Sequence, residues 1–168
     1  MNLLEKAKQE GINNLCPYAQ RLFKELKPVL GNIDPMKISE ESKIEISPIK
    51  KDWLLHISIE PKDRNVPGLH IEASKSEFIL TYAGGCQLED HSNPASDADY
   101  LIKESVDNTA RYLNGITIVQ YYNRKGKSFM KKYYYGINTE NDKDKLIGTD
   151  LSFFSKAHST KRITYKFT

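Results

Sequence analysis

Alternation of apolar and polar side chains with a period of two residues is the feature that most constrains how this chain folds. In WLLHISIE (residues 53–60) every second residue, beginning with the tryptophan, is apolar, and the pattern returns at 69–73 and 77–83. Turn-forming residues at 61–68 separate the first two runs. Short alternating runs of this kind are typical of antiparallel strands with one apolar face. The sequence therefore predicts an antiparallel meander over residues 43–83.

Helical spacing of apolar residues precedes and follows this meander. Over residues 1–31 apolar side chains recur at every third or fourth position, and Gly31 is a natural helix stop. A second helix is predicted over 97–113, with Ser96 as a suitable N-cap. Because the apolar face of the meander must be covered, the amphipathic N-terminal segment is a candidate to pack on it.

The residues after the second helix predict a hairpin over 116–135, in which the basic turn RKGK (124–127) joins two strands rich in aromatic residues. Further strands are predicted within 151–167. Polar residues at 86–96 and 138–150 predict loops, the second of them mobile.

A chain of 168 residues has the length of one domain. The order of elements predicts a single α+β domain over 1–168. Its mainly antiparallel sheet has about six strands, with the N-terminal helical segment and one central helix packed on it. No apolar run approaches the roughly 18 residues that span a bilayer, and the N-terminus mixes charges with its apolar residues. We therefore expect a cytoplasmic protein without a membrane partner.

Charge is distributed unevenly along the chain, although its formal net value is only +3. Residues 86–107 carry one lysine against six acidic residues, whereas residues 108–168 carry twelve basic residues against four acidic ones. An asymmetry of this kind steers charged partners.

The common signatures of catalysis and cofactor binding are not found. Cys86 and His91 are close in sequence, but proximity alone does not give the contact that a cysteine nucleophile needs with its base. The four histidines have no metal-ligand spacing, although His56 and His70 are expected on the same side of adjacent strands, facing solvent. Gly84-Gly85 lies too far before a helix to cradle a phosphate. We expect no enzyme, no catalytic residue, no metal, no cofactor and no small-molecule substrate.

Two kinds of macromolecular partner remain. The hairpin 116–135 combines lysines and arginine with six aromatic residues, which is the chemistry that binds single-stranded nucleic acid. Strand alternation, however, assigns most of these aromatic side chains to the core, so nucleic acid is the less favoured partner. A protein partner is favoured, because tyrosine provides large contact area and an acidic segment suits a basic surface. The candidate partner-binding residues are Glu89, Asp90, Asp97, Asp99, Glu104, Tyr121 and Tyr134.

Residues 53–136 resemble the immunity proteins of bacterial contact-dependent growth inhibition systems. The similar features are the strand and turn in HISIEPKDRNVPGLHIEAS, the glycine pair in EFILTYAGGCQLEDH, a helix ending in ARYLNGI, and the hairpin with its Gly-Lys tip. The resemblance implies an antitoxin: a cytoplasmic protein that binds a cognate toxin C-terminal domain one-to-one and blocks its active site. If that toxin is a nuclease, its basic cleft suits the acidic candidates. The resemblance assigns no site residue by itself.

Overall fold

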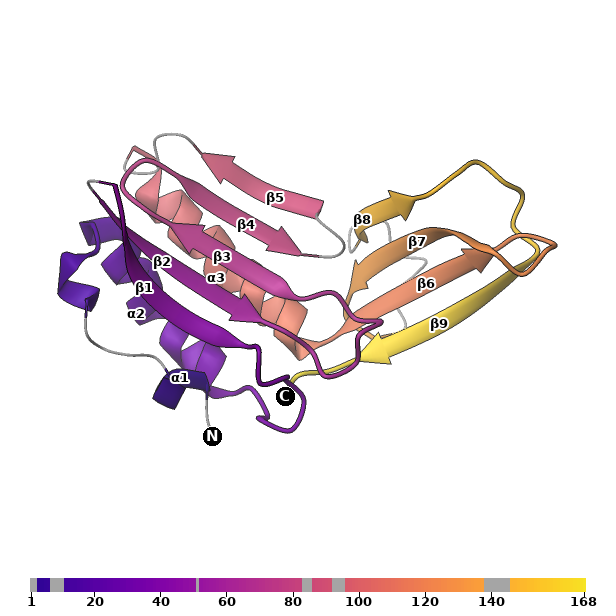
Figure 1. Cartoon of the computed structure of the whole chain (residues 1–168), viewed down its shortest axis with the longest axis horizontal. Helices are drawn as coiled ribbons and strands as arrows, with labels where there is room; N and C mark the ends of the chain where they lie inside the picture. The colour runs from indigo at the N-terminus through magenta and orange to yellow at the C-terminus, as the bar shows by residue number, and fades with distance from the viewer. Residues whose placement is uncertain (1–2, 7–10, 51, 83–85, 92–95, 138–145) are drawn as a thin grey trace. The chain divides into compact units, whose positions relative to one another are not determined.

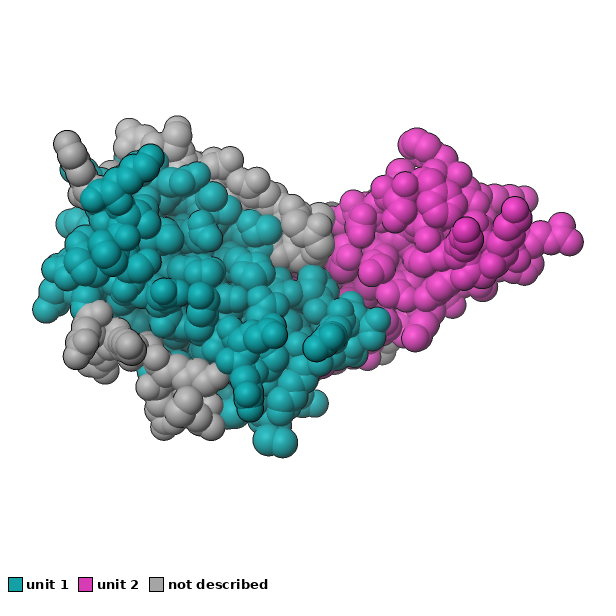
Figure 2. All heavy atoms as spheres, in the orientation of Figure 1, with its two compact units in different colours: residues 1–110, 167–168 teal, residues 111–166 magenta. Residues whose placement is uncertain are grey.

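The structure is a computed structural model that describes residues 3–6, 11–50, 52–82, 86–91, 96–137 and 146–168. The chain divides into two compact units, shown in different colours in Figure 2. Unit 1 comprises residues 1–110 with 167–168, and unit 2 comprises residues 111–166. The single domain expected over the whole chain stays a prediction, and each unit is taken by itself below.

The sheet of unit 1 is an antiparallel meander of five strands in the order β1-β2-β3-β4-β5 (Figure 1). Its strands are β1 (Lys43–Ile49), β2 (Asp52–Ile59), β3 (Leu69–Ala73), β4 (Phe78–Tyr82) and β5 (Cys86–His91). Each strand pairs with the next along the chain, as Ile57 of β2 does with Ile71 of β3. The predicted meander is thereby confirmed, with one strand added at its end.

The helices are α1 (Leu3–Lys6), η1 (Ile12–Asn14), α2 (Pro17–Gly31) and α3 (Ala98–Asn114). Helix α2 begins with Pro17, which is tolerated there because the first N–H groups of a helix have no partner within it. Its apolar face is buried and comprises Tyr18, Ala19, Leu22, Phe23, Leu26 and Leu30. In Figure 1, α2 and α3 lie on one side of the five-stranded sheet.

The apolar faces of the strands and helices form the core of unit 1. The inward-facing side chains of β2, β3 and β4 are fully buried and comprise Leu55, Ile57, Ile59, Leu69, Ile71, Ala73, Phe78 and Leu80. The intervening residues on β2 and β3, among them His56 and His70, form the polar outer face. One face of the sheet therefore packs against helices, and the other is left for polar contacts.

Tyr18 connects α2 to the turn between β3 and β4. Its hydroxyl donates to the main-chain oxygens of Ser74 and Glu77, and burial raises the pKa of the hydroxyl well above its usual value. An unfolded tyrosine loses its proton near pH 10, whereas folded Tyr18 keeps it. The unfolded state then binds fewer protons than the folded state, so stability is present below pH 10 and is lost as the pH rises above it.

Above pH 10 the free energy of unfolding of Tyr18→Phe is therefore expected to fall less steeply with pH than that of the wild type. The expected difference in slope is about 1.4 kcal/mol per pH unit. At neutral pH the same change lowers stability by about 1–3 kcal/mol, because the Ser74 oxygen loses its donor. Urea unfolding of both proteins across this pH range measures the two effects. Parallel declines above pH 10 would contradict the assignment to Tyr18.

Unit 2 is a four-stranded antiparallel sheet in the order β8-β7-β6-β9. Its strands are β6 (Ile116–Tyr122), β7 (Ser128–Tyr135), β8 (Leu146–Leu151) and β9 (Ser159–Tyr165). The predicted hairpin is confirmed, with Ile118 opposite Tyr133 at its centre.

The α+β class, with its N-terminal and central helices, is confirmed, but the strands form two sheets. The loop predicted over 86–96 is wrong for 86–91, which form β5, and the loop predicted over 138–150 is wrong from Leu146 onwards, where β8 begins. Among the described residues, both strands are sheet edges that pair on one side only. An edge strand needs fewer apolar residues than a central one, so both read as polar loops. Residues 138–145 lie outside the described part of the chain.

Candidate functional site

The acidic candidates are gathered mainly at the start of α3. Asp97 and Asp99 are exposed there, and the Asp99 carboxylate forms an ion pair with Arg21 of α2. Glu104 lies further along α3 and is half-buried. Glu89 and Asp90 are on β5, where the structure describes the backbone but not their side chains. The structure therefore places two of the five acidic side chains together on an exposed surface.

Tyr121 and Tyr134 lie on the same face of the sheet of unit 2, as alternation predicts. They share a side-chain hydrogen bond, and burial together with Tyr121 raises the pKa of Tyr134. Tyr134 is only 5% exposed, whereas Tyr121 is half-buried and has the Lys132 ammonium 5.7 Å from its ring centroid. Of the two, Tyr121 offers more surface to a partner.

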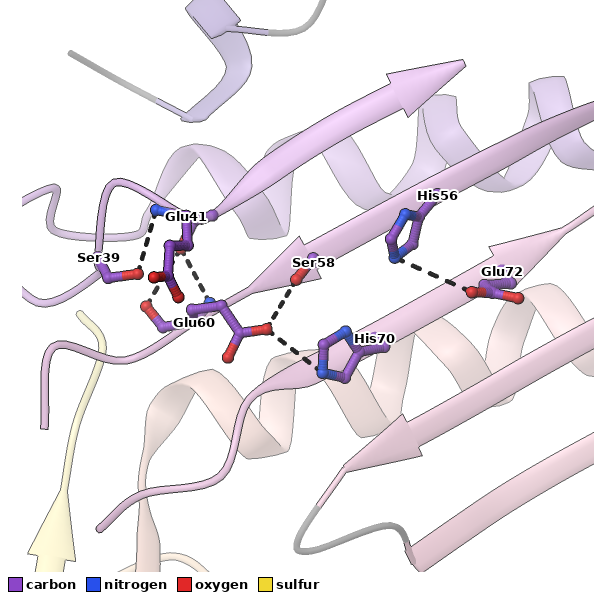
Figure 3. A network of polar contacts seen from close by, with 8 residues as sticks. Ser39, Glu41, His56, Ser58, Glu60, His70 and Glu72 are labelled. Atoms are coloured by element: carbon purple, nitrogen blue, oxygen red, sulfur yellow. Dashed lines mark hydrogen bonds and ion pairs between the residues drawn. The ribbon is translucent and has the colours of Figure 1, made fainter. Parts of the chain in front are cut away.

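Two histidine–glutamate pairs occupy the polar face of the sheet of unit 1 (Figure 3). The rings of His56 and His70 stack with their centroids 6.4 Å apart, as their expected place on adjacent strands implies. His70 Nε2 lies 3.4 Å from Glu60 Oε1, and His56 Nε2 lies 4.0 Å from Glu72 Oε1. Burial lowers the pKa of His56, although Glu72 opposes this effect. Among the described residues, no group of three or more histidine, cysteine, aspartate or glutamate side chains is arranged to hold a metal ion.

The division into units coincides with a reversal of charge. Unit 2 carries twelve lysines and arginines against four acidic residues, a net charge of +8, whereas the remainder of the chain has a net charge of −5. The exposed cations of unit 2 that the structure describes include Arg124, Lys125, Lys127, Lys156, Lys161 and Arg162. A unit with this excess of positive charge attracts polyanions.

A hollow of about 670 Å³ lies between the tip of the β6–β7 hairpin and the segment before β9. Its lining comprises Asn123, Arg124, Lys125, Ser155, Lys156, Ala157 and His158. We call it the tip groove. Four of these seven side chains are basic, and none is acidic.

Hydrogen bonds donated by main-chain N–H groups fix both walls of the tip groove. The Asn123 carbonyl Oδ1 accepts hydrogen bonds from the N–H groups of Lys125 and Lys127, both at 3.0 Å. Gly126 has φ +72°, a left-handed conformation that glycine adopts without strain. On the opposite wall, the His158 N–H donates to the Tyr122 oxygen at 2.8 Å. The basic side chains therefore project from an ordered turn and an anchored segment.

Two phenylalanines lie just before the residues of this second wall. Phe154 is 92% exposed and Phe153 is 41% exposed. Phe153 remains in contact with the sheet, since its ring centroid lies 5.9 Å from that of Phe129. Phe154 thus presents almost its whole ring to solvent within two residues of Lys156.

Phe153, Phe154, Lys156 and His158 are not among the candidate residues predicted from the sequence. The strands predicted within 151–167 include one over 151–154, in which alternation buries one of two successive aromatic residues. In the structure β8 ends at Leu151, and neither phenylalanine is buried. Two adjacent aromatic residues followed closely by lysine and histidine are the signal that was available.

Comparison with protein-family models, with curated proteins and with solved structures gave no match. In the described part of the chain, no helix combines the length and apolar character needed to cross a membrane.

Proposed function

We propose that this chain binds single-stranded nucleic acid through unit 2. The observation that carries the proposal is the tip groove, which is lined by four basic side chains, and the exposed Phe154 lies two residues before Lys156 of that lining. This proposal differs in one respect from the nucleic-acid binding that the sequence of the hairpin 116–135 predicts. The stacking residue lies in the segment before β9, because Phe129, Tyr133 and Tyr134 of the hairpin are buried.

Phosphate binding is the first component of the proposed interaction. Arg124 and Lys125 lie on one wall of the tip groove and Lys156 on the other, so a backbone that passes between them meets cations on both sides. Each phosphate neutralised releases counterions, which is the main source of affinity for a polyanion. The hydrogen bonds of Asn123 hold the turn in place before binding, which reduces the entropy lost on association.

Base stacking is the second component and determines the preference for single strands. A ring as exposed as that of Phe154 offers a flat face to an unpaired base. Such stacking contributes about 1–3 kcal/mol per base and depends little on sequence. The bases of a duplex are already stacked on each other, so a duplex gains only the phosphate contacts.

Phe154→Ala is therefore expected to weaken binding of a labelled oligouridylate by about tenfold, with little change for a duplex of equal length. Fluorescence anisotropy with the full chain measures both affinities. Leu151→Ala is the matched control, because Leu151 is another exposed apolar residue nearby. Equal losses in the two variants, or equal losses for single strand and duplex, would contradict a stacking role.

We also propose, as a second candidate, the immunity function that the sequence resemblance implies. The observation that favours it is the exposed acidic start of α3, with Asp97 and Asp99 in a unit of net charge −5. A surface of this kind complements the basic cleft of a nuclease toxin. In this proposal the protein acts in the cytoplasm, binds the toxin domain one-to-one and has no catalytic step.

Calorimetry with any toxin-type C-terminal domain that is encoded beside this chain tests the second candidate. Nanomolar one-to-one binding that weakens in Asp97→Asn/Asp99→Asn would support it. Absence of binding would remove it and would leave the proposal for unit 2 unaffected.

A further inference from the structure

We propose that unit 1 has a second binding site, a pocket beside Glu60 that takes a small zwitterion carrying a guanidinium or ammonium group and a carboxylate. The pocket is a hollow of about 630 Å³, within the range of small-ligand sites. Its lining comprises Ser39, Glu41, Glu60, Pro61, Lys62, Arg64, Val66, Pro67 and Gly68, all of unit 1. It is independent of the tip groove and of the function proposed for unit 2.

The backbone of Glu60 is fixed just after the end of β2. Its N–H donates to Ser42 Oγ at 2.9 Å, and its main-chain oxygen accepts from Ser42 Oγ at 3.1 Å and from the Ser39 N–H at 2.7 Å. Ser42 itself is 1% exposed. The position of Glu60 is therefore set by buried contacts rather than by a mobile loop.

One oxygen of the Glu60 carboxylate is used within unit 1. Oε1 accepts a hydrogen bond from Ser58 Oγ at 2.8 Å and lies 3.4 Å from His70 Nε2 (Figure 3). Ser58 is 5% exposed, so this contact is held in the sheet. The contacts of Oε1 with Ser58 and His70 set the orientation of the carboxylate plane.

The other oxygen of the carboxylate, Oε2, has no hydrogen-bond donor among the described residues. It lies over Gly68, where a Cβ atom would come within 2.5 Å of it. The absence of a side chain at Gly68 thus leaves room for the carboxylate beside the pocket. A half-buried carboxylate with one oriented and unused oxygen is suited to accept a hydrogen bond from a cationic ligand.

The remaining charged side chains give the pocket both negative and positive charge. Glu41 adds a second carboxylate, whereas Lys62 and Arg64 add two cations. No ion pair among the described residues involves any of these three side chains. The buried Val66 and Pro61 contribute apolar surface between them. A ligand with a cation for Glu60 and an anion for Lys62 or Arg64 matches this distribution, and a guanidinium forms the better paired hydrogen bonds with a carboxylate.

Titration of the full ¹⁵N-labelled chain with free L-arginine tests the proposal. We expect saturable shifts of the amide signals around Glu60 and Gly68, with a dissociation constant on the order of 1 mM for a ligand of this size. Agmatine, which lacks the carboxylate, and glutarate, which lacks the cation, should each bind at least about tenfold more weakly, since each loses one charged contact. Failure of L-arginine to saturate, or equal binding of either analogue, would overturn the zwitterion site.

Two substitutions assign the site to Glu60. Glu60→Gln keeps the shape and removes the charge, and Gly68→Ala displaces the end of a flexible side chain, so both proteins should fold. Each should weaken L-arginine binding by about tenfold or more. Asp107→Asn, an exposed change on α3 of the same unit, should leave it unaltered. Unchanged binding in Glu60→Gln with a native amide spectrum would overturn the assignment, whereas oligonucleotide binding is expected to be the same in all of these variants.

Discussion

Lys125→Glu/Lys156→Glu is expected to reduce the affinity for single-stranded oligonucleotide by about 100-fold or more. The two lysines stand on opposite walls of the tip groove, and a hydrogen bond to a charged group contributes about 1.5–3 kcal/mol. Both side chains are exposed, so the protein should fold normally. Anisotropy measurements at fixed salt give the affinity, and circular dichroism checks the fold.

Lys24→Glu/Lys103→Glu is the matched control for this result. Both residues are exposed in unit 1 and change the net charge by the same amount. Affinity should fall far less in the control, because the tip groove is intact. Equal losses of affinity in the two double variants would show that affinity depends on overall charge. That result would contradict binding at the tip groove.

Phe78→Ala is expected to lower the free energy of unfolding by about 3–5 kcal/mol. Phe78 is fully buried on β4, between β3 and β5, and its side chain belongs to the core under the helices. Its removal loses apolar burial and leaves a cavity that the neighbouring strands cannot close. Urea unfolding of the purified proteins measures the difference.

Ile79→Ala is the control, because Ile79 is the next residue on β4 and is only half-buried. Alternation directs its side chain to the opposite face, so the loss should be smaller by at least about 2 kcal/mol. A larger loss for Ile79 than for Phe78 would mean that the two faces of the sheet are exchanged.

The meander, the two main helices and the hairpin were predictable because each leaves a local pattern. The period of two in residues 53–60 depends on one buried face, and the structure buries Leu55, Ile57 and Ile59. The helical period before Gly31 likewise corresponds to the buried face of α2. Such elements are specified by residues near one another in the sequence.

The edge strands and the two-sheet arrangement were not predictable on this basis. In the described part of the chain, β5 and β8 each pair with one neighbouring strand, and neither needs a regular apolar face. The separation of β6–β9 from the meander depends on pairing between Ile118 and Ile163, which are far apart in the sequence. Local patterns do not encode such pairing.

The candidate sites also depend on contacts between segments that local sequence patterns do not bring together. The basic turn at 124–127 was recognised, but its place opposite Lys156 follows from the hydrogen bond between His158 and Tyr122. The Glu60 pocket depends on Gly68 lying across from the end of β2, which only the fold reveals. The sequence indicates which residue types are present, whereas the fold determines which of them are neighbours.

The salt dependence of oligonucleotide binding tests the central claim most directly. The measurement is the anisotropy of a labelled oligouridylate of about 12 nucleotides with the full chain, between about 50 and 200 mM salt. The three cations of the tip groove, Arg124, Lys125 and Lys156, predict that a plot of log K against log salt has a slope of about −2 for the wild type, and a slope less steep by about 1.4 after loss of Lys125 and Lys156. A slope near zero, or no binding at about 100 µM protein in the lowest salt, would contradict the account.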